Sequence, residues 1–338
     1  MLRFITVNTH SRTPKYHQIY NSIVAGIENK DIVPGDKLPS IREICDEFDV
    51  AKRTVEKAYD LLRDNGIVDA TKGKGYYINH TTLGQNLKIF LLFNKLSTHK
   101  KMIYDAFVAA LGSRTAIDFF VYNNDYRLFK ELIQSHNRHY THYVIIAHFN
   151  DSDEKTYELL NTLPRHKLIL LDKLPDGITG SYGAVYQNFE KDLYQTLTEA
   201  LPLLRKYATL NILFPFQHYH PKAILTGFYK FCHEYEFTAR VISDIGQETI
   251  RPQNAYINLV EEDLVALIKR IKDTAYKIGD EVGILSYNET PLKELLLDGI
   301  TVMSTDFAQM GRTAARLVQE NSTDHVENPF RLIVRKSL

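Results

Sequence analysis

A chain of 338 residues is too long for one ordinary hydrophobic core, so two or three compact units are expected. Its 44% hydrophobic and 24% charged residues are typical of a globular protein. Two widely separated cysteines, Cys45 and Cys232, argue against a disulfide framework and indicate a reducing cytosol. Neither a signal peptide nor a run of the ~20 apolar residues that span a bilayer is found, so we expect a cytoplasmic protein without a membrane partner.

The charge balance by itself does not favour nucleic-acid binding. Lys and Arg number 41, and Asp and Glu also number 41. Residues 1–80 carry 12 Lys and Arg against 11 Asp and Glu. Any DNA-binding surface must therefore arise from where the charges lie on the folded chain.

A first helix is predicted to begin at Pro14, because proline is well tolerated in a first turn. It carries one apolar stripe, formed by Tyr16, Ile19, Tyr20, Ile23, Val24 and Ile27. A Pro-Gly turn at 34–35 follows it. Ser40 and Glu43 then have the spacing of a capping box, so Ser40 is predicted to cap a short second helix. The buried side of that helix is expected to be Ile41, Ile44, Cys45 and Phe48.

A third helix is predicted from about Lys52 to Asn65, after a tight turn at 49–51. Its inward positions are Val55, Ala58, Tyr59 and Leu62, and its outward positions are Lys52, Arg53, Glu56, Lys57 and Asp60. Two short helices joined by so small a turn predict a helix-turn-helix. Because the start of the second of these helices enters the major groove, Lys52, Arg53 and Thr54 are expected to contact the bases and phosphates of double-stranded DNA.

Two short strands at 67–70 and 75–78 flank the turn 71–74 and predict a hairpin, or wing. Lys72 and Lys74, with Gly73 between them, would bring backbone and positive charge close to a phosphate. A Lys-Gly turn taken alone is more often a solvated hairpin. The ordered combination of the three helices and this hairpin favours a DNA-binding domain.

Residues 14–78 resemble the winged-helix domain of GntR-type regulators, and the segments 34–43, 53–59 and 72–75 carry the resemblance. It implies that Ser40 and Arg42 contact the DNA backbone, that Gly73 is the wing tip, and that Lys57 lies on the recognition helix with Lys52, Arg53 and Thr54. Glu56 departs from the family, in which many members have a DNA-contacting arginine at this position. The commonest operator of the family is therefore not expected here.

After a short linker at 81–86, strand-like and helical segments alternate to the end of the chain. Strands are predicted at 87–93, 116–121, 143–147, 167–171, 210–214, 239–243, 255–259 and 282–286, and helices at 100–111, 127–136, 188–204, 221–234, 261–275 and 307–320. This alternation predicts parallel sheets with helices on both faces, and residues 87–338 are enough for two such lobes.

No catalytic signature is found, so neither an enzyme nor a cofactor is expected. The chain lacks a Gly-x-Gly-x-x-Gly segment, a P-loop and a Gly-x-Ser-x-Gly elbow. Its clustered histidines lack a consistent spacing with carboxylates, so ordinary solvated or packed histidines are favoured over a metal site. They are His136, His139, His142, His218 and His220.

The order of elements in 87–338 resembles the two-lobed core of LacI/GalR regulators, which is similar to periplasmic sugar-binding proteins. The segments 168–173 with 184–189, 279–292, and 306–312 with 331–337 carry this resemblance. It implies an α/β fold overall: a winged helix-turn-helix followed by a two-lobed α/β/α, periplasmic-binding-protein-like domain that binds an effector and dimerises.

Departures from that family limit which ligand residues can be transferred. Asn288 stands at the first acidic position of the late strand, Lys222 replaces an arginine that anchors sugar hydroxyls, and the usual Asn-Asp pair near 260–261 is missing. A sugar site needs planar hydrogen-bonding groups and an aromatic face. Candidates for the hydrogen-bonding groups are Asn94, His99, Lys222, Asn288 and Glu289. The aromatic face remains unassigned.

The combination resembles arabinose-repressor-type regulators and implies a repressor that works as a homodimer and responds to a monosaccharide, of the L-arabinose or L-fucose type. A ligand would act by population shift, changing the spacing of the two DNA-binding domains. Two alternatives stay open: a regulator whose C-terminal domain only dimerises, and an enzyme fused to a winged-helix domain.

Overall fold

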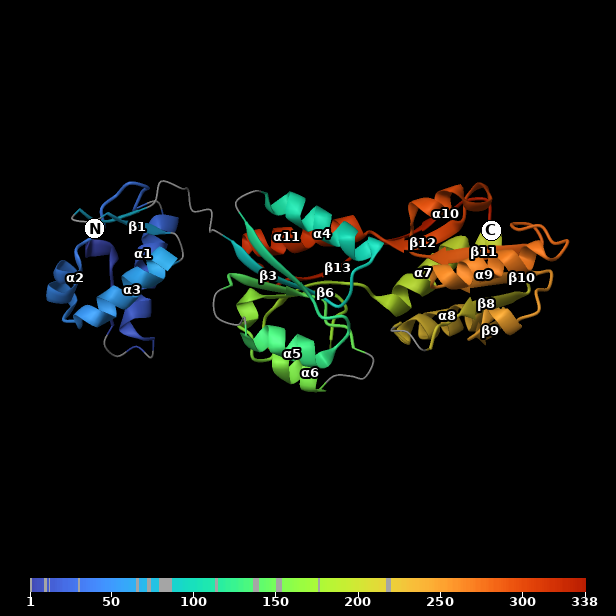
Figure 1. Ribbon diagram of the computed structural model, residues 1–338, viewed down its shortest axis with the longest axis horizontal. Helices are drawn as coiled ribbons and strands as arrows, with labels where there is room; N and C mark the ends of the chain where they lie inside the picture. The colour runs from blue at the N-terminus through green and yellow to red at the C-terminus, as the bar shows by residue number, and fades with distance from the viewer. Residues whose placement is uncertain are drawn as a thin grey trace. The chain divides into compact units, whose positions relative to one another are not determined.

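The computed structural model describes residues 2–8, 11, 13–29, 31–64, 67–71, 74–78, 87–112, 115–135, 140–149, 154–175, 177–216 and 220–338. The chain divides into an N-terminal unit that extends to Leu87 and a C-terminal unit that begins at Lys88 (Figure 1). The predicted linker at 81–86 lies outside the described residues. Each unit is described by itself below.

The N-terminal unit is a helical domain with a two-stranded hairpin (Figure 1). Its elements are η1 (Leu2–Phe4), α1 (Lys15–Glu28), α2 (Ile41–Phe48), α3 (Lys52–Asp64), β1 (Val68–Thr71) and β2 (Gly75–Ile78). β1 and β2 pair antiparallel, and an isolated bridge joins Lys37 to Tyr77 beside them. These bounds confirm the predicted order of three helices and a hairpin.

The predicted apolar stripes of this unit form one core. Ile19 and Ile23 of α1 and Val55 and Tyr59 of α3 are fully buried together. The hydroxyl of Tyr59 donates to the Pro39 carbonyl at 2.6 Å, so its burial leaves no unpaired polar group. Ile5, in the segment before α1, is also buried in this core.

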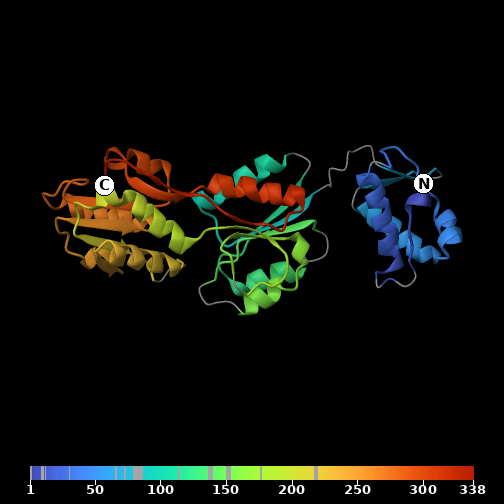
Figure 2. The same ribbon diagram turned by 180° about the vertical axis from the view of Figure 1, so that it is seen from behind.

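Lobe 1 of the C-terminal unit is built on a sheet with the order β13-β7-β6-β5-β3-β4. Its elements are β3 (Lys88–Phe93), α4 (Thr98–Leu111), β4 (Ala116–Val121), α5 (Tyr126–Ser135), β5 (His142–Ile145), α6 (Glu154–Leu160), η2 (Arg165–Lys167), β6 (Leu168–Asp172), β7 (Gly183–Tyr186), α11 (Phe307–Glu320) and β13 (His325–Glu327). The pairs from β13 to β3 are parallel. Helices α4 and α11 cover one face of the sheet and α5 and α6 the other, as the two opposite views show (Figures 1 and 2).

Lobe 2 has a second sheet of six strands with the order β14-β12-β11-β10-β8-β9. Its elements are α7 (Phe189–Leu204), β8 (Thr209–Leu213), α8 (Ala223–Glu234), β9 (Thr238–Ile242), η3 (Ile245–Gln247), β10 (Asn254–Asn258), α9 (Glu261–Lys272), β11 (Val282–Tyr287), α10 (Pro291–Leu295), η4 (Leu296–Asp298), β12 (Thr301–Thr305) and β14 (Phe330–Ile333). The sheet is parallel except for β14, which runs antiparallel to β12. One core lies under α7 and α8, and another under α9.

The chain passes between the two sheets three times: after β7, after β12 and after β13. The three connections are hydrogen-bonded to one another. Asn328 N donates to Tyr186 O at 2.7 Å, and Asp306 N donates to Pro329 O at 3.0 Å. The lobes are therefore joined by three adjacent segments, as expected for a two-lobed sensor.

The α/β class predicted from the sequence is confirmed, but several elements were not predicted. They include β7, β12, β13 and the short helices α6 and α10. Three of the five residues of β12 are Thr or Ser, so it lacks the apolar run that marks a buried strand. It is nevertheless buried, because its hydroxyls find local partners: Thr301 Oγ1 donates to the Arg335 carbonyl at 3.0 Å.

Candidate functional site: a DNA-binding surface and a buried polar cluster

The start of α2 is fixed by the capping box that the sequence predicts. Ser40 Oγ accepts from Glu43 N at 3.2 Å, and Glu43 Oε2 accepts from Ser40 N at 2.6 Å. These bonds lower the pKa of Glu43 below its usual value. Asp49 then ends the helix in the left-handed region, with a φ of 46°. This sharp reversal brings α3 into its helix-turn-helix position.

The predicted DNA-contacting side chains at the start of α3 are accessible. Lys52 and Arg53 are exposed and Thr54 is half-buried, whereas Val55 just beyond them is fully buried. Arg42 of α2 is also exposed and lies 3.6 Å from Asp46. Exposed ion pairs of this kind contribute little to stability, so these cations are available to a phosphate.

A hollow of about 550 Å³ joins the two helices to the hairpin. It is lined by Ser40, Ile41, Arg42, Cys45, Lys52, Gly75 and Tyr76. Three predicted DNA-contacting residues from two helices, Ser40, Arg42 and Lys52, therefore surround one concave surface beside the wing. The sequence pattern did not predict this hollow, because it depends on how the hairpin packs against α2.

The remaining DNA-contact predictions differ in their outcome. Lys57 Nζ lies 3.9 Å from the ring centroid of Tyr16, so its side chain is directed towards α1. Lys74 is exposed in the turn, immediately before β2. Lys72 and Gly73 lie outside the described residues.

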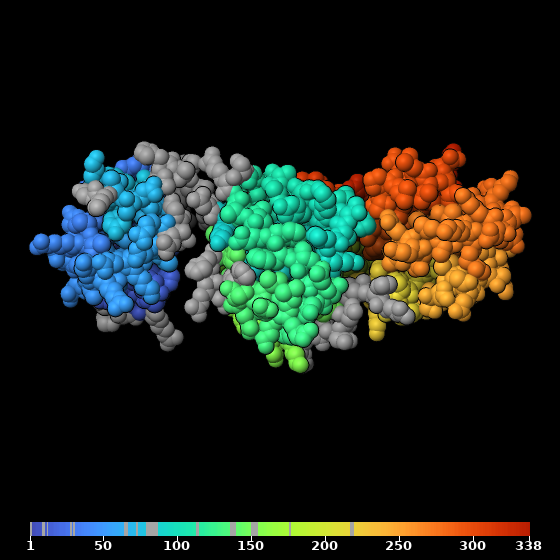
Figure 3. Space-filling model, viewed as in Figure 1, coloured from blue at the N-terminus to red at the C-terminus, as the bar shows by residue number. Residues whose placement is uncertain are grey.

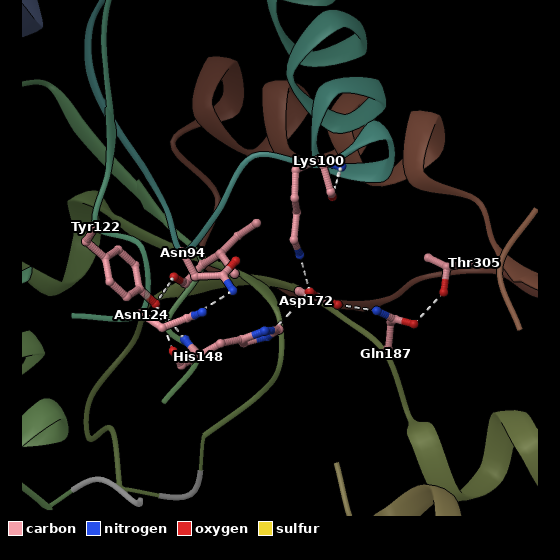
Figure 4. Close-up of polar contacts among 10 residues, drawn as sticks. Asn94, Lys100, Tyr122, Asn124, His148, Asp172, Gln187 and Thr305 are labelled. Carbon is pink, nitrogen blue, oxygen red and sulfur yellow. Dashed lines mark hydrogen bonds and ion pairs between the residues drawn. The ribbon is translucent and has the colours of Figure 1, made fainter. Parts of the chain in front are cut away.

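A buried cluster of polar side chains lies at the carboxyl ends of the lobe 1 strands (Figure 4). We call it the Asp172 cluster; its members are Lys100, His148, Asp172, Gln187 and Thr305. Asp172 Oδ2 accepts from Lys100 Nζ and lies 3.4 Å from His148 Nε2. Gln187 Nε2 donates to Asp172 Oδ1, and Thr305 Oγ1 donates to Gln187 Oε1.

The Asp172 cluster links the two lobes. Lys100 belongs to α4 of lobe 1, Gln187 lies in the first connection, and Thr305 ends β12 of lobe 2. Asp172 has a φ of 78°, which is unusual for a residue other than glycine. Such a backbone persists only where the surrounding contacts hold it, and it is most often found at functional sites.

The charge states within the cluster follow from burial and attraction. Burial would raise the pKa of Asp172, but the attraction of Lys100 and the hydrogen bonds outweigh it and bring the pKa to about 2. Burial lowers the pKa of His148 to about 3, despite the nearby carboxylate. At neutral pH the cluster therefore contains an ionised aspartate paired with a lysine, beside a neutral histidine.

Three of the five predicted effector residues directly follow a strand, and a fourth, His99, lies in the first turn of α4; together they lie on both sides of the junction between the lobes. Asn94 follows β3, and its Nδ2 donates to Asn124 Oδ1 at 3.0 Å (Figure 4). His99 Nε2 lies 3.1 Å from the Glu289 carbonyl, which joins lobe 1 to lobe 2 directly. Burial lowers the pKa of His99. Asn288 precedes Glu289 and has a φ of 61°.

Other contacts hold these residues in place. Lys293 is buried, and its Nζ donates to the carbonyls of Tyr287 at 2.9 Å and Asn288 at 2.6 Å. Glu289 Oε2 accepts from Arg335 Nη2 at 2.5 Å. The fifth candidate, Lys222, is exposed at the start of α8, and no polar contact joins it to the other four among the described residues.

Several buried polar atoms near the junction have no hydrogen-bond partner within the described part of the chain. They include Asn94 Oδ1, Asp192 Oδ2, Tyr287 Oη and Asn288 Oδ1. Burial raises the pKa of Asp192 to about 7. Because buried polar atoms are normally paired, these atoms favour a site that a polar ligand completes.

Sequence reasoning missed the Asp172 cluster, although one signal pointed to it. Asp172 directly follows the apolar strand predicted at 167–171, and side chains at the carboxyl ends of parallel strands commonly form binding sites. Lys100 gives no such signal, since a lysine in the first turn of a helix is normally solvated.

Two family models match the chain. Residues 15–78 match the model of the bacterial regulatory proteins of the gntR family, and residues 217–338 match the periplasmic binding protein-like domain. The HTH-type transcriptional repressor YtrA of Bacillus subtilis strain 168 is 32% identical over 106 residues, which are 31% of this chain and 78% of YtrA.

Solved structures share the fold of the C-terminal unit. The dimeric Lac repressor with an 11-residue C-terminal deletion matches 74% of this chain and 98% of its own, with a TM-score of 0.61 and 15% identity. A LacI family transcriptional regulator of Lactobacillus casei, with bound glucose, matches 74% of this chain and 100% of its own, with a TM-score of 0.58 and 10% identity. At these identities the likeness concerns the fold alone.

A capped helix-turn-helix followed by a hairpin, ahead of two parallel-sheet lobes, defines a transcription regulator with a LacI-like second domain. The chain belongs to the gntR family of bacterial regulatory proteins. The resemblances stated from the sequence are thereby confirmed.

Two further findings concern only the residues that the structure describes. No helix among them is long and apolar enough to cross a membrane. No group of three or more His, Cys, Asp and Glu side chains among them is placed to hold a metal ion.

Proposed function

We propose that this protein is a sequence-specific, DNA-binding repressor that a small-molecule effector controls. In this proposal residues 1–80 bind the operator, residues 81–86 link the two domains, and residues 87–338 bind the effector and form the dimer. The protein acts in the cytoplasm, catalyses no reaction and uses no cofactor. The single observation that carries the DNA-binding half is the exposed start of α3: Lys52 and Arg53 are both exposed, and Lys52 lines the same hollow as Ser40 and Arg42.

The experiment for this half is a binding titration with the DNA upstream of the protein's own gene. Arg53→Ala and Lys52→Ala should each weaken binding by about 1–3 kcal/mol, since each removes a base or phosphate contact. The matched control is Arg316→Ala, which removes an exposed cation from α11 of the C-terminal unit and should leave the affinity unchanged. A double variant of Lys52 and Arg53 that binds as tightly as the wild type would contradict the assignment.

The favoured effector is an uncharged monosaccharide, a pentose or deoxyhexose of the L-arabinose or L-fucose type. Asn94 and Asn288 offer amide oxygens from the two lobes that have no partner among the described residues, and such acceptors suit sugar hydroxyls. The buried Lys100 is already paired with Asp172, so it offers no free charge to an acidic ligand. The glucose held by the regulator from Lactobacillus casei is a precedent for a sugar in this fold.

A thermal-shift screen of the full chain against monosaccharides tests the effector. A sugar that binds the folded state should raise the melting temperature, and Asn288→Ala should abolish the shift. Arg312→Ala, on the exposed side of α11, should retain it. If no sugar shifts the melting temperature, the alternative of a C-terminal domain that only dimerises is favoured instead.

Regulation would require a second copy of the chain. Leu292 and Leu295 of α10 are exposed, and Leu295 reaches 79% exposure on a helix that forms part of the lobe 2 surface (Figure 3). Burying this pair in a homodimer would bring together two copies of the DNA-binding domain, which is what two half-sites about one helical turn apart require. An effector that binds the two lobe arrangements unequally then changes that spacing. Light scattering should give a dimer, and Leu295→Lys should give a monomer.

A further inference from the structure

The second turn of α3 carries a carboxylate on the surface that is proposed to enter the major groove. Glu56 follows Lys52 by four residues and Arg53 by three, so the three side chains lie on neighbouring positions of one helix side. The next residue, Lys57, is directed towards Tyr16 of α1 instead. Glu56 therefore continues the outward side that Lys52 and Arg53 begin.

A cation lies beside the carboxylate of Glu56. Lys52 Nζ lies 3.3 Å from Glu56 Oε1, and the Glu56 side chain is 42% exposed. A lone carboxylate would be repelled by the phosphates of DNA, but this pairing offsets its charge. The contact with Lys52 is made through Oε1, and the carboxylate can accept a further hydrogen bond through Oε2.

An acceptor in the major groove can match only certain base edges. Guanine presents acceptors there at N7 and O6, and thymine presents an acceptor at O4, so both repel a carboxylate. Cytosine presents the donor N4 amino group. Adenine also has an amino group, but its N7 acceptor lies beside it, and a carboxylate cannot satisfy both. Cytosine is therefore the base that fits Glu56.

We propose that Glu56 is a specificity-determining residue that selects a cytosine in each operator half-site, with the neighbouring Lys52 offsetting the charge of its carboxylate. This inference rests on the proposed function of sequence-specific DNA binding. The proposal explains why this chain has Glu56 where many family members have a DNA-contacting arginine: the residue recognises a different base, and the contact is not lost.

Selection of binding sites from a random duplex pool by the full-length protein tests the proposal. The wild type should select cytosine at one position of each half-site, and any other base there should weaken binding about tenfold. Glu56→Gln should shift that position to adenine, because a glutamine amide pairs with both N6 and N7. Glu56→Ala should lose the preference at that position alone.

Asp60→Ala is the matched control. Asp60 lies one turn further along α3, where Arg63 Nη2 donates to it at 2.8 Å, and its replacement should leave the selected sequence unchanged. If both Glu56 variants select the wild-type sequence with the wild-type strength, the proposal is wrong. If the wild type itself enriches no sequence, the proposed DNA-binding function fails, which is a separate outcome.

Discussion

The proposed DNA-binding surface and the Asp172 cluster both contain lysines paired with carboxylates, but in opposite surroundings. On α3, Lys52 and Glu56 are solvated, with 76% and 42% of their side chains exposed. In the cluster, Lys100 and Asp172 are buried, with 8% and 6% exposed. A solvated pair contributes little to stability and keeps its charges available, whereas a buried pair is costly to break. The first arrangement suits contact with a phosphate, and the second suits the coupling of two lobes.

The largest expected effect is on the buried pair. Asp172→Ala leaves Lys100 as an uncompensated buried charge and should lower the free energy of unfolding by about 3–5 kcal/mol, measured by urea denaturation of the full chain. The matched control is Asp105→Ala, which breaks the exposed Lys101–Asp105 pair on the same helix and should cost no more than about 1 kcal/mol.

A double variant still tests the cost of the buried charge if Asp172→Ala fails to fold. Replacing Lys100 by Met and Asp172 by Asn removes both charges together, and Asn tolerates the positive φ and keeps an acceptor for Gln187, so this double variant should recover most of the lost stability. If Asp172→Ala and Asp105→Ala lowered the free energy of unfolding equally, burial would not make the Lys100–Asp172 pair more costly to break than the exposed pair.

The pH dependence of stability offers a smaller effect. Burial holds the pKa of His148 at about 3, so below pH 6.5 the unfolded chain takes up a proton that the folded chain does not. The free energy of unfolding should therefore fall from pH 6.5 towards pH 3, by about 1.4 kcal/mol per pH unit from this group. His148→Gln should make the slope shallower by that amount in urea titrations at pH 7, 6 and 5.

The slope of the His148→Gln variant has to be compared with that of the wild type, because other buried groups titrate in the same pH range. Burial raises the pKa of Asp192 to about 7, so the folded state binds a proton there and gains stability as the pH falls. Burial lowers the pKa of His142 to about 4, which acts in the same direction as His148. Replacing the exposed His233 of α8 by Gln is the control, and a slope altered as much as in His148→Gln would contradict the assignment.

The smallest effect concerns the cap that begins α2. Ser40→Ala removes the hydrogen bond to Glu43 N and should lower the free energy of unfolding of the N-terminal unit by about 1 kcal/mol. Ser40→Asp keeps a good capping group but adds a negative charge beside the hollow. It should retain the melting temperature and weaken DNA binding. If Ser40→Asp binds DNA as well as the wild type, Ser40 does not contact a phosphate.

The N-terminal unit could be predicted in detail because its signals are local. Ser40 and Glu43 are three residues apart, and the apolar stripe of α3 repeats every three or four residues. Each signal lies within one helix or turn, so the order of elements followed directly. Even here, the hollow beside Arg42 depended on how the hairpin packs and was not predicted.

The sequence by itself determined the helix-turn-helix, its exposed cations and the alternation that makes two parallel-sheet lobes. Only the tertiary structure decided which polar residues meet between those lobes. Lys100 and Asp172 are 72 residues apart, and Gln187 and Thr305 are 118 apart. These contacts depend on the order of the strands and on the three connections that run between the lobes. Neither feature produces a periodic pattern in the sequence. The physical reason is that capping and amphipathic patterns act within one turn, whereas a buried ion pair forms only after distant strands are placed.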